Sequence, residues 1–278
     1  MIPLVSIIIT VYNKSEYLKE AIDSALNVNY ENIEIIIIDD GSTDSSLNIL
    51  NNYRENKQIR IILNETNRGI VFARNKAINQ AKGKFIIQLD ADDTIHSEFI
   101  RKATPYFDDN DIGIVYGDTY FFGGKNGHFD LGEYSLKKQL STNQIVITAL
   151  FKRTDFLKTN GYDNLFSIGY EDWDFWLSII GLNKKVVQLN IPSLNYRFIY
   201  DSRNNSISKE NLFKIRNNIF KKHFKLYVEN FHDPINIFWE NKNLKNINAK
   251  LESHKSSLSF KIFEFFIFPF ALIKKILK

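Results

Sequence analysis

The chain has 278 residues, of which 44% are hydrophobic and 24% are charged, and it contains no cysteine. These values are typical of globular proteins and exclude a disordered chain, a disulfide framework, a thiolate zinc site and a cysteine nucleophile. The net charge of +4 is unevenly spread: residues 1–202 hold 21 Lys and Arg against 26 Asp and Glu, whereas residues 203–278 hold 15 against 6. We expect a principal domain over residues 1–205 and a helical, basic C-terminal extension over residues 206–278.

The first hundred residues alternate between strand and helix patterns. Continuous apolar runs such as Val5–Val11 are typical of strands buried on both faces. Such alternation predicts an α/β fold, with a mostly parallel twisted sheet flanked by helices. The predicted strands are 5–11, 33–38, 59–63 and 84–89; the predicted helices are 15–27, capped by Ser15, a second that starts at Thr43 or Asp44, and 70–81.

The rest of the chain is less regular. The pattern predicts strands at 112–116, 144–151 and 185–189, a loop or hairpin at 121–132, helices at 155–159 and 171–180, and Lys- and Asn-rich helices over 209–259.

Acidic residues follow two of the predicted parallel strands. Ligands of open parallel sheets bind outside the carboxyl ends of the strands. Those ends carry Thr10-Val11-Tyr12-Asn13, Asp39-Asp40-Gly41-Ser42 and Asp90-Ala91-Asp92-Asp93. Five carboxylates would repel one another unless a divalent metal or a nucleobase donor joined them. Each cluster alone also fits turn chemistry and helix capping, an alternative that weakens when both follow neighbouring strands.

Several nucleotide and hydrolase motifs are absent. No G-x-G-x-x-G follows the first strand, and neither a P-loop nor a G-x-S-x-G elbow occurs, which disfavours dinucleotide-dependent enzymes, P-loop NTPases and α/β-hydrolases. The five histidines are dispersed and do not indicate a zinc site.

Five motifs in order resemble family 2 glycosyltransferases of the GT-A fold, over about residues 3–200. They are Pro3 to Asn13, Ile37 to Asp44, Asn67-Arg68-Gly69 with Ala73-Arg74-Asn75, Leu89 to Asp93, and Asn160 to Asp163 followed by Gly169 to Trp176.

The resemblance implies a nucleotide-sugar donor, usually a UDP-sugar, that supplies a hexosyl or N-acetylhexosaminyl group. Asp40 would accept a hydrogen bond from the uracil imide N–H. Tyr12 would lie against the base, and Thr10 would line the same pocket. Arg74 would lie near the nucleotide or its diphosphate, since a fixed cation suits phosphate.

The resemblance also implies a D-x-D motif at Asp90, Ala91 and Asp92 that binds Mg²⁺ or Mn²⁺. Asp92 would be the direct metal ligand, with Asp90 toward the ribose or the waters of the metal. Asp93 is an alternative ligand. The metal would bridge the diphosphate and stabilise the charge on departing UDP.

The acceptor side is expected around Glu171 and Asp172. The resemblance assigns Asp172 as the general base, which takes the proton from the acceptor hydroxyl in a single displacement that inverts the anomeric configuration. An acid-rich helix N-terminus favoured by the macrodipole is the structural alternative. Trp173 and Trp176 would line the acceptor site or, at helical spacing, lie in the core.

A looser match concerns a segment that closes over the donor. Tyr196 and Arg197, together with the loop that carries Ser206 and Ser208, resemble that segment. Arg203 is a candidate for the basic residue that the family places just after it.

The C-terminal residues 260–278 combine aromatic residues with Lys274, Lys275 and Lys278. Such a segment is too short to span a bilayer, and we expect it to lie on an anionic membrane surface. Packing on the domain or on a homodimer partner is the alternative, and no nucleic-acid motif supports binding to nucleic acid. The first residues lack a signal-peptide pattern, so we expect a cytoplasmic protein, peripheral on the inner face of the plasma membrane.

These inferences predict an inverting glycosyltransferase that acts on a glycan or lipid-linked acceptor in the biosynthesis of surface polysaccharide or lipopolysaccharide. Two alternatives stay open at this point: a nucleotidylyltransferase on a related sheet, and a sugar-nucleotide-binding protein without turnover.

Overall fold

A computed structural model describes residues 1–199, 207–231, 243, 245–250 and 252–253. By its internal contacts the chain divides into two units, Met1–Asn230 and Phe231–Lys278. The predicted extension over 206–278 therefore contributes residues 206–230 to the first unit and the remainder to the second. Residues 245–250 are helical within the second unit. Among the described residues, no helix is both long and apolar enough to cross a membrane.

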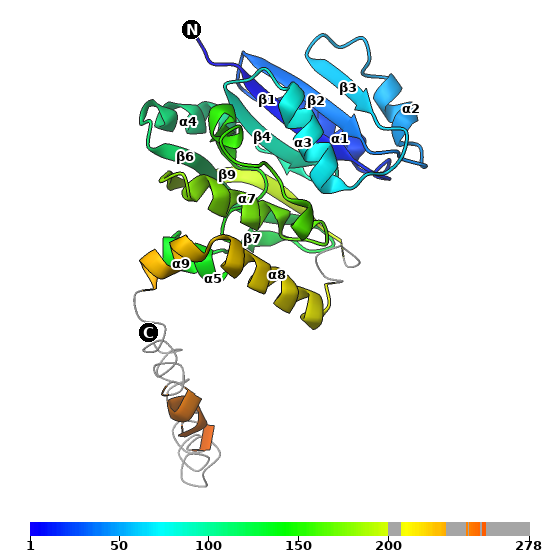
Figure 1. The fold of residues 1–278 in the computed structure, drawn as a ribbon. Coiled ribbons are helices and arrows are strands. Elements are labelled where there is room, and N and C mark those ends of the chain that lie inside the picture. The colour runs from blue at the N-terminus through cyan, green and yellow to red at the C-terminus, as the bar shows by residue number, and fades with distance from the viewer. Residues whose placement is uncertain (200–206, 232–242, 244, 251, 254–278) are drawn as a thin grey trace, which may run out of the picture. The chain divides into compact units, whose positions relative to one another are not determined.

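The first half of the chain forms the predicted parallel sheet. Strand β1 pairs in parallel with both β2 and β4, and β2 pairs with β3 (Figure 1). All seven residues of β1 are buried, as its uninterrupted apolar run predicts. The elements are β1 Val5–Val11, α1 Leu18–Leu26, β2 Ile33–Asp39, α2 Ser46–Asn51, β3 Ile59–Leu63, α3 Ile70–Gln80 and β4 Phe85–Asp90.

The second half adds strands of both directions to the same sheet, so that the order is β3-β2-β1-β4-β8-β6-β9-β5, with β7 paired to β6. Strand β8 is antiparallel to β4 and β6, whereas β6 and β9 are parallel. Short helices connect these strands. The elements are β5 Thr94–Ile95, α4 Phe99–Ala103, a 3₁₀ helix Thr104–Asp108, β6 Ile112–Gly123, β7 Gly127–Phe129, α5 Leu136–Ser141, β8 Leu150–Lys152, α6 Arg153–Phe156, a 3₁₀ helix Asn164–Phe166, α7 Glu171–Ile180 and β9 Lys185–Phe198.

Several predicted boundaries in this half are wrong. The strand predicted at 185–189 continues to Phe198, because Pro192 sits at a bulge, where its missing N–H is tolerated. The strand predicted at 144–151 is reduced to β8. Helix α5 was not predicted, although Ser135 caps it by accepting from the Lys138 N–H. Ser15 does not cap α1: Tyr17 precedes that helix, and the Ser15 N–H donates to Asp44.

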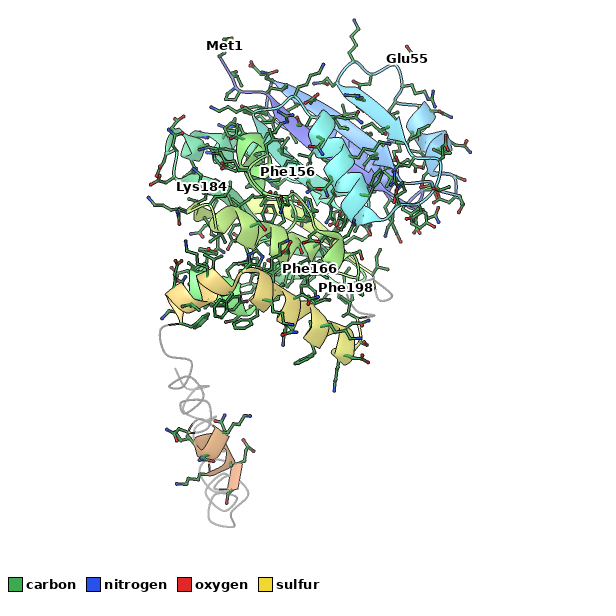
Figure 2. The ribbon with its side chains drawn as sticks, viewed as in Figure 1. Met1, Glu55, Phe156, Phe166, Lys184 and Phe198 are labelled. Carbon is green, nitrogen blue, oxygen red and sulfur yellow. The ribbon has the colours of Figure 1, made fainter. Side chains whose placement is uncertain are left out.

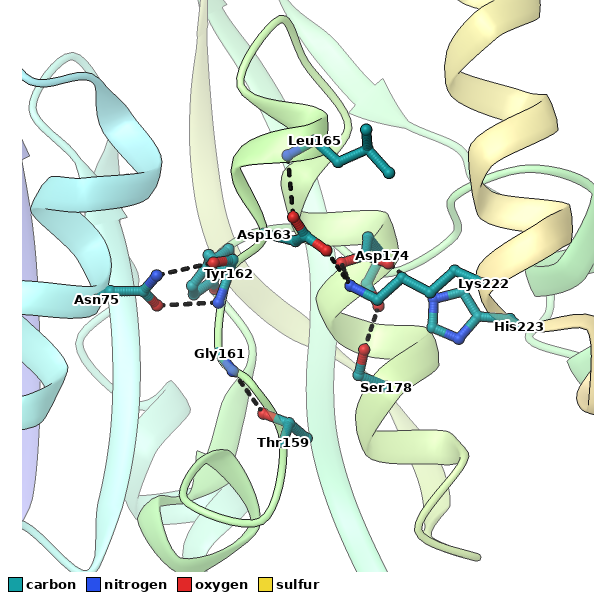
Figure 3. A network of polar contacts seen from close by, with 10 residues as sticks. All are labelled: Asn75, Thr159, Gly161, Tyr162, Asp163, Leu165, Asp174, Ser178, Lys222 and His223. Carbon is teal, nitrogen blue, oxygen red and sulfur yellow. Dashed lines mark hydrogen bonds and ion pairs between the residues drawn. The ribbon is translucent and has the colours of Figure 1, made fainter.

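Aromatic side chains pack α7 against the sheet. Trp176 is fully buried, and its ring lies edge-on to Phe151 of β8 at 5.7 Å between centroids. Phe156, labelled in Figure 2, packs against Phe175 of α7 in the same way. The Asn75 side chain of α3 bonds both the N–H and the carbonyl oxygen of Tyr162 (Figure 3). Gly161 leaves room for it, because a Cβ at position 161 would lie 2.6 Å from Asn75 Oδ1. The positions of these elements therefore rest on close packing around α7.

Two C-terminal helices, α8 Lys209–Lys222 and α9 Phe224–Asn230, complete the first unit. Asp174 of α7 is fully buried, and its carboxylate accepts hydrogen bonds from Lys222 Nζ and contacts His223 Nε2, both at 2.8 Å (Figure 3). Lys222 Nζ also donates to Asp163 at 2.8 Å. Burial alone lowers the pKa of Lys222, but the two carboxylates outweigh it and raise that pKa above its usual value.

We predict that Asp174→Ala lowers the free energy of unfolding by about 2–3 kcal/mol, because it leaves a buried histidine and a partly buried ammonium without their shared partner. Urea unfolding followed by circular dichroism measures the change. Asp163→Asn is the matched control and should cost less than about 1 kcal/mol, since Asp163 is partly exposed. Equal losses in the two variants would show that Asp174 does not stabilise the contact with Lys222 and His223 more than Asp163 does.

Candidate active site

The carboxyl ends of β1, β2 and β4 meet in one pocket of about 490 Å³. Parallel pairing brings these ends together, since Thr10 lies beside Ile38 on one side and Asp90 on the other. The structure thus gathers at one place the sequence-predicted residues Thr10, Tyr12, Asp40, Arg74, Asp90, Ala91, Asp92 and Asp93. Lys14, Asn67, Gly69, Ile70, Ala73, Ser167, Tyr196, Arg197 and Ile199 also line the pocket.

The two acids after β2 have different roles. Asp39 is a turn residue: its Oδ1 accepts the backbone N–H groups of Gly41 and Ser42, at 3.2 and 2.9 Å. Asp40 lines the pocket and accepts hydrogen bonds from Asn64 Nδ2 and from the Gly69 N–H, both at 2.7 Å. The turn alternative therefore holds for Asp39, while Asp40 faces the pocket.

The loop that carries Tyr12 is fastened to the β2–α2 loop. Asn13 adopts a left-handed conformation with φ 51°, and its Oδ1 accepts from the Thr43 N–H at 2.8 Å. The Asn13 N–H in turn donates to Ser42 Oγ at 2.9 Å. Tyr12 is 45% exposed at this point, so its ring has a free surface in the pocket.

Arg74 is the buried centre of an ion-pair chain. Its Nη2 donates to Asp90 Oδ1 at 2.8 Å and its Nη1 to Glu171 Oε1 at 2.7 Å. Arg74 and Glu171 are both 2% exposed. Burial lowers the pKa of Arg74, but the two carboxylates outweigh it and raise that pKa above its ordinary value. Arg74 therefore links the pocket to the start of α7, and at least two of its N–H groups donate to protein carboxylates.

Two further cations face the acids of the pocket; Lys14 was not predicted as a site residue, and Arg197 was predicted only as part of the loosely matched segment. Lys14 Nζ donates to Asp92 Oδ2 at 2.5 Å, and the Arg197 side chain donates to the Asp92 carbonyl oxygen at 2.9 Å. Lys14 lies one residue beyond the end of the first motif, so its position after β1 was the available signal. Arg197 and Tyr196 belonged to the loosely matched segment, and both line the pocket.

Asp93 is buried beneath Asp92. Its Oδ1 accepts from the Arg197 N–H at 2.7 Å, which ties β9 to the D-x-D segment. Burial, followed by the charges of Asp92 and Asp90, raises the pKa of Asp93 well above its usual range. Asp93 is 2% exposed, whereas 21% of the Asp92 side chain is exposed, so Asp92 is the more accessible of the two as a metal ligand.

Asp172 begins α7 beside Glu171. Its Oδ2 accepts from Asn143 Nδ2 at 2.9 Å, and its Oδ1 lies 2.8 Å from the Trp173 N–H. Asn143 follows α5 and belongs to no motif, so no sequence signal pointed to it. Arg74 bonds both Asp90 of the pocket and Glu171, the first residue of α7. Asp172 is the next residue of that helix, so this ion-pair chain ties its position to the pocket.

Three residues expected on the acceptor side and in the lid have protein partners in the structure. Trp173 is 2% exposed and its indole N–H donates to the Gln139 carbonyl, so the core alternative describes its position. Glu171 is buried in its ion pair with Arg74. Ser208 caps α8 by accepting from the Asn211 N–H. Arg203, Ser206 and residues 260–278 lie outside the described residues.

Comparisons with known proteins agree on the kind of protein. The family model described as "Glycosyl transferase family 2" matches residues 6–175. An uncharacterised glycosyltransferase of Haemophilus influenzae is 34% identical over 183 residues, which cover 64% of this chain and 72% of the relative. One of Methanocaldococcus jannaschii is 31% identical over 223 residues, which cover 74% of each.

Solved structures share the fold. TarS of S. aureus, in complex with UDP-GlcNAc, has a TM-score of 0.63 at 19% identity and covers 81% of this chain and 72% of its own. The mannosyltransferase PcManGT from Pyrobaculum calidifontis, in complex with GDP-Man and Mn²⁺, has a TM-score of 0.58 at 16% identity and covers 98% of this chain and 81% of its own. These neighbours are GT-A glycosyltransferases, and their sheet of parallel and antiparallel strands is the one described above. With a family model that spans more than half of its length, the chain belongs to glycosyltransferase family 2.

Proposed function

We propose that this glycosyltransferase moves a sugar from a UDP-sugar to a hydroxyl of a glycan or lipid-linked acceptor, with inversion at the anomeric carbon. The observation that carries the proposal is the pocket of about 490 Å³ in which three strand ends present carboxylates and cations together. A uridine diphosphate can use both the carboxylates and the cations, because the imide N–H of its base donates to a carboxylate and its phosphates bond to cations.

The uridine half of the donor is assigned to the ends of β1 and β2. The Asp40 carboxylate accepts from Asn64, from Gly69 and from the Arg68 N–H, which is shared between both oxygens at 3.1 Å. A carboxylate has about four acceptor positions, so the uracil imide N–H would take the place of one half of this shared contact. The exposed ring of Tyr12 would stack on the base, with Thr10 beneath it. The TarS complexes with UDP-GlcNAc and UDP support this choice of nucleotide.

The donor set also fits a divalent cation. No group of three His, Cys, Asp or Glu within the described part of the chain could hold a metal by itself. Mg²⁺ and Mn²⁺ at phosphate sites need only one or two carboxylates, because the phosphates supply the other ligands. Asp92, with Asp90 beside it, would hold the cation, which would replace the Lys14 ammonium that now contacts Asp92 Oδ2. When bound, the cation would offset the charge that develops on the leaving UDP.

Asp172 is the proposed general base. Its carboxylate would take the proton of the acceptor hydroxyl as that oxygen attacks the anomeric carbon from the side opposite UDP. The Asn143 amide donates to Asp172 Oδ2, so the other lone pairs of the carboxylate are held in a defined orientation. Arg74, through Glu171 and Asp90, would keep the start of α7 in register with the donor pocket.

A screen for UDP release tests the proposal. The full chain is incubated with a panel of UDP-sugars and GDP-sugars, each with and without Mn²⁺. We expect UDP release from at least one UDP-sugar, dependent on Mn²⁺ or Mg²⁺. Binding of UDP without release from any donor, even with acceptor extracts, would favour a binding protein without turnover.

We further propose a role in assembly of surface polysaccharide or lipopolysaccharide, with residues 260–278 attached to the inner face of the plasma membrane. Removal of 260–278 should move the protein from the membrane fraction to the soluble fraction, because the aromatic and basic residues that favour anionic lipid are lost. Changing Lys274, Lys275 and Lys278 to Gln should weaken attachment and make it insensitive to salt. Unchanged fractionation of both variants would contradict the proposal.

A further inference from the structure

Helices α8 and α9 carry large apolar side chains on the side that faces solvent. In the part of the chain that the structure describes, the exposed phenylalanines are Phe213, Phe220 and Phe224, and all three belong to these helices. They are 73%, 44% and 55% exposed, and Val228 is 52% exposed. We call these four residues the aromatic face. Single exposed apolar residues are common, whereas several on one helix surface mark an interaction site.

Helical spacing brings these side chains together. Phe220 follows Phe213 by about two turns of α8, and its ring lies edge-on to that of Phe224, at 5.6 Å between centroids. Ile215 and Ile219 lie on the opposite side of the helix, where they are 3% and 0% exposed. Packing against the protein therefore covers only one of the two apolar sides of α8.

The inner side of the helix pair is also fixed by polar contacts. Lys222 at the end of α8 donates to the carboxylates of Asp163 and Asp174 (Figure 3). The Tyr227 hydroxyl of α9 donates to the Leu140 carbonyl oxygen of α5 at 2.6 Å. The two helices lie along the lower edge of the first unit (Figure 1). The aromatic face is therefore a rigid part of that unit.

Basic side chains border the aromatic face. Each of its three phenylalanines is followed directly by a lysine, namely Lys214, Lys221 and Lys225. The next residue of a helix lies about 100° further around the axis, so these ammonium groups flank the rings. Exposed glutamates four residues away pair with Lys214 and Lys225. Over residues 207–230, however, six Lys and Arg outnumber two Glu, so the border of the face is positive.

This charge decides what can cover the face. A second copy of the chain would bring two positive borders together, and their repulsion opposes such a contact. Residues 231–278 hold eight Lys against four Asp and Glu, so this segment has the same sign as the face. An anionic lipid surface is complementary in both respects. It accepts aromatic rings at the boundary between headgroups and acyl chains, and it attracts the lysines beside them.

We propose that the aromatic face docks the first unit onto an anionic membrane surface. Phe213, Phe220 and Phe224 would enter the interface, and the lysines that follow them would lie among the phosphate headgroups. The inference adds a second, structured site to the membrane attachment proposed for residues 260–278, and it does not depend on sugar transfer. Weak membrane signals add, so loss of either site is expected to release the protein.

A dye attached to the face tests the contact directly, because the chain has no cysteine of its own. The full chain with Phe220→Cys is labelled with an environment-sensitive dye and mixed with vesicles of equal parts phosphatidylcholine and phosphatidylglycerol. We expect a blue shift of the emission with these vesicles and little change with phosphatidylcholine alone. Tyr106→Cys is the matched control: Tyr106 is also 44% exposed but lies in another helix, so its dye should not respond.

Two triple variants of the full chain test the rings and the charges separately. One combines Phe213→Ser, Phe220→Ser and Phe224→Ser; the other combines Lys214→Gln, Lys221→Gln and Lys225→Gln. Each should weaken binding to the anionic vesicles about tenfold or more in a sedimentation assay. A control with Lys57→Gln, Lys82→Gln and Lys102→Gln should stay within about twofold, because it removes the same charge far from the face.

Several results would overturn the inference. They are an unshifted dye at Phe220→Cys, or loss of vesicle binding on removal of residues 260–278 but in neither triple variant, which would leave those residues as the attachment. A dimer in the absence of lipid that the Phe variant loses would assign the face to a second copy. Binding of duplex DNA in preference to vesicles would assign it to nucleic acid. UDP affinity should stay within about twofold throughout, since no residue of the face lines the strand-end pocket.

Discussion

Asp172→Asn is expected to lower the rate of sugar transfer by about 10²–10⁴-fold, the usual contribution of a positioned general base. The amide has nearly the shape of the carboxylate but cannot take the acceptor proton. Its oxygen can still lie near the Trp173 N–H, as Asp172 Oδ1 does at 2.8 Å. Because Asp172 does not line the strand-end pocket, UDP affinity should change by less than about twofold. Turnover is measured as UDP release, and affinity by calorimetry on the same preparation.

Two variants separate a catalytic loss from a structural one. Asp111→Asn removes an exposed carboxylate that pairs only with Lys185 among its described contacts, and it should leave both rate and affinity unchanged. Asn143→Ala removes the donor to Asp172 Oδ2, which favours the ionised carboxylate. The acid limb of the pH–rate profile should therefore move to higher pH in Asn143→Ala. Normal turnover by Asp172→Asn would show that another group acts as the base.

The gathering of residues at the strand-end pocket could be predicted from the sequence because its parts are local. Each of the three strands is a mainly apolar run, parallel pairing aligns their ends, and the polar residues come directly after them. Sequence order alone therefore placed Asp40, Asp90 and Asp92 on one edge of the sheet. The pattern alone did not distinguish Asp39 from Asp40, since the difference lies in which carboxylate bonds the turn; only the family resemblance pointed to Asp40.

The second half of the fold could not be predicted to the same degree. Strand β8 has three residues, and β9 contains Pro192 and polar residues, so pairing partners rather than local pattern decide where these strands end. The contacts of the proposed base and of its neighbour Glu171 are also distant in sequence: Asn143 lies 29 residues before Asp172, and Arg74 lies 97 residues before Glu171. A short sequence motif cannot contain both members of such a pair.

The ion-pair chain through Arg74 leads to the second large expected effect. Arg74→Met should lower the free energy of unfolding by about 3–5 kcal/mol, because it leaves Glu171 buried without its described cation. Asp90 should contribute less to the loss, since 33% of its side chain is exposed and water can solvate it, whereas the Glu171 side chain is 3% exposed. Methionine fills most of the volume of the arginine stem, so the loss reports the charge more than a cavity. Urea unfolding measures it.

A double variant decides whether the buried charge is the cause. Arg74→Met combined with Glu171→Gln removes both charges of the buried pair, and it should recover about half or more of the stability that Arg74→Met loses. Arg68→Met is the matched control from the start of the same helix region: its guanidinium lies over the Phe72 ring, and its loss should cost less than about 1 kcal/mol. If Arg74→Met is as stable as the native chain, or if Glu171→Gln adds a further loss, then the link between the donor pocket and α7 is not electrostatic. In that case the position of Asp172 would depend on the packing of Trp173 and Trp176 and on the hydrogen bond from Asn143.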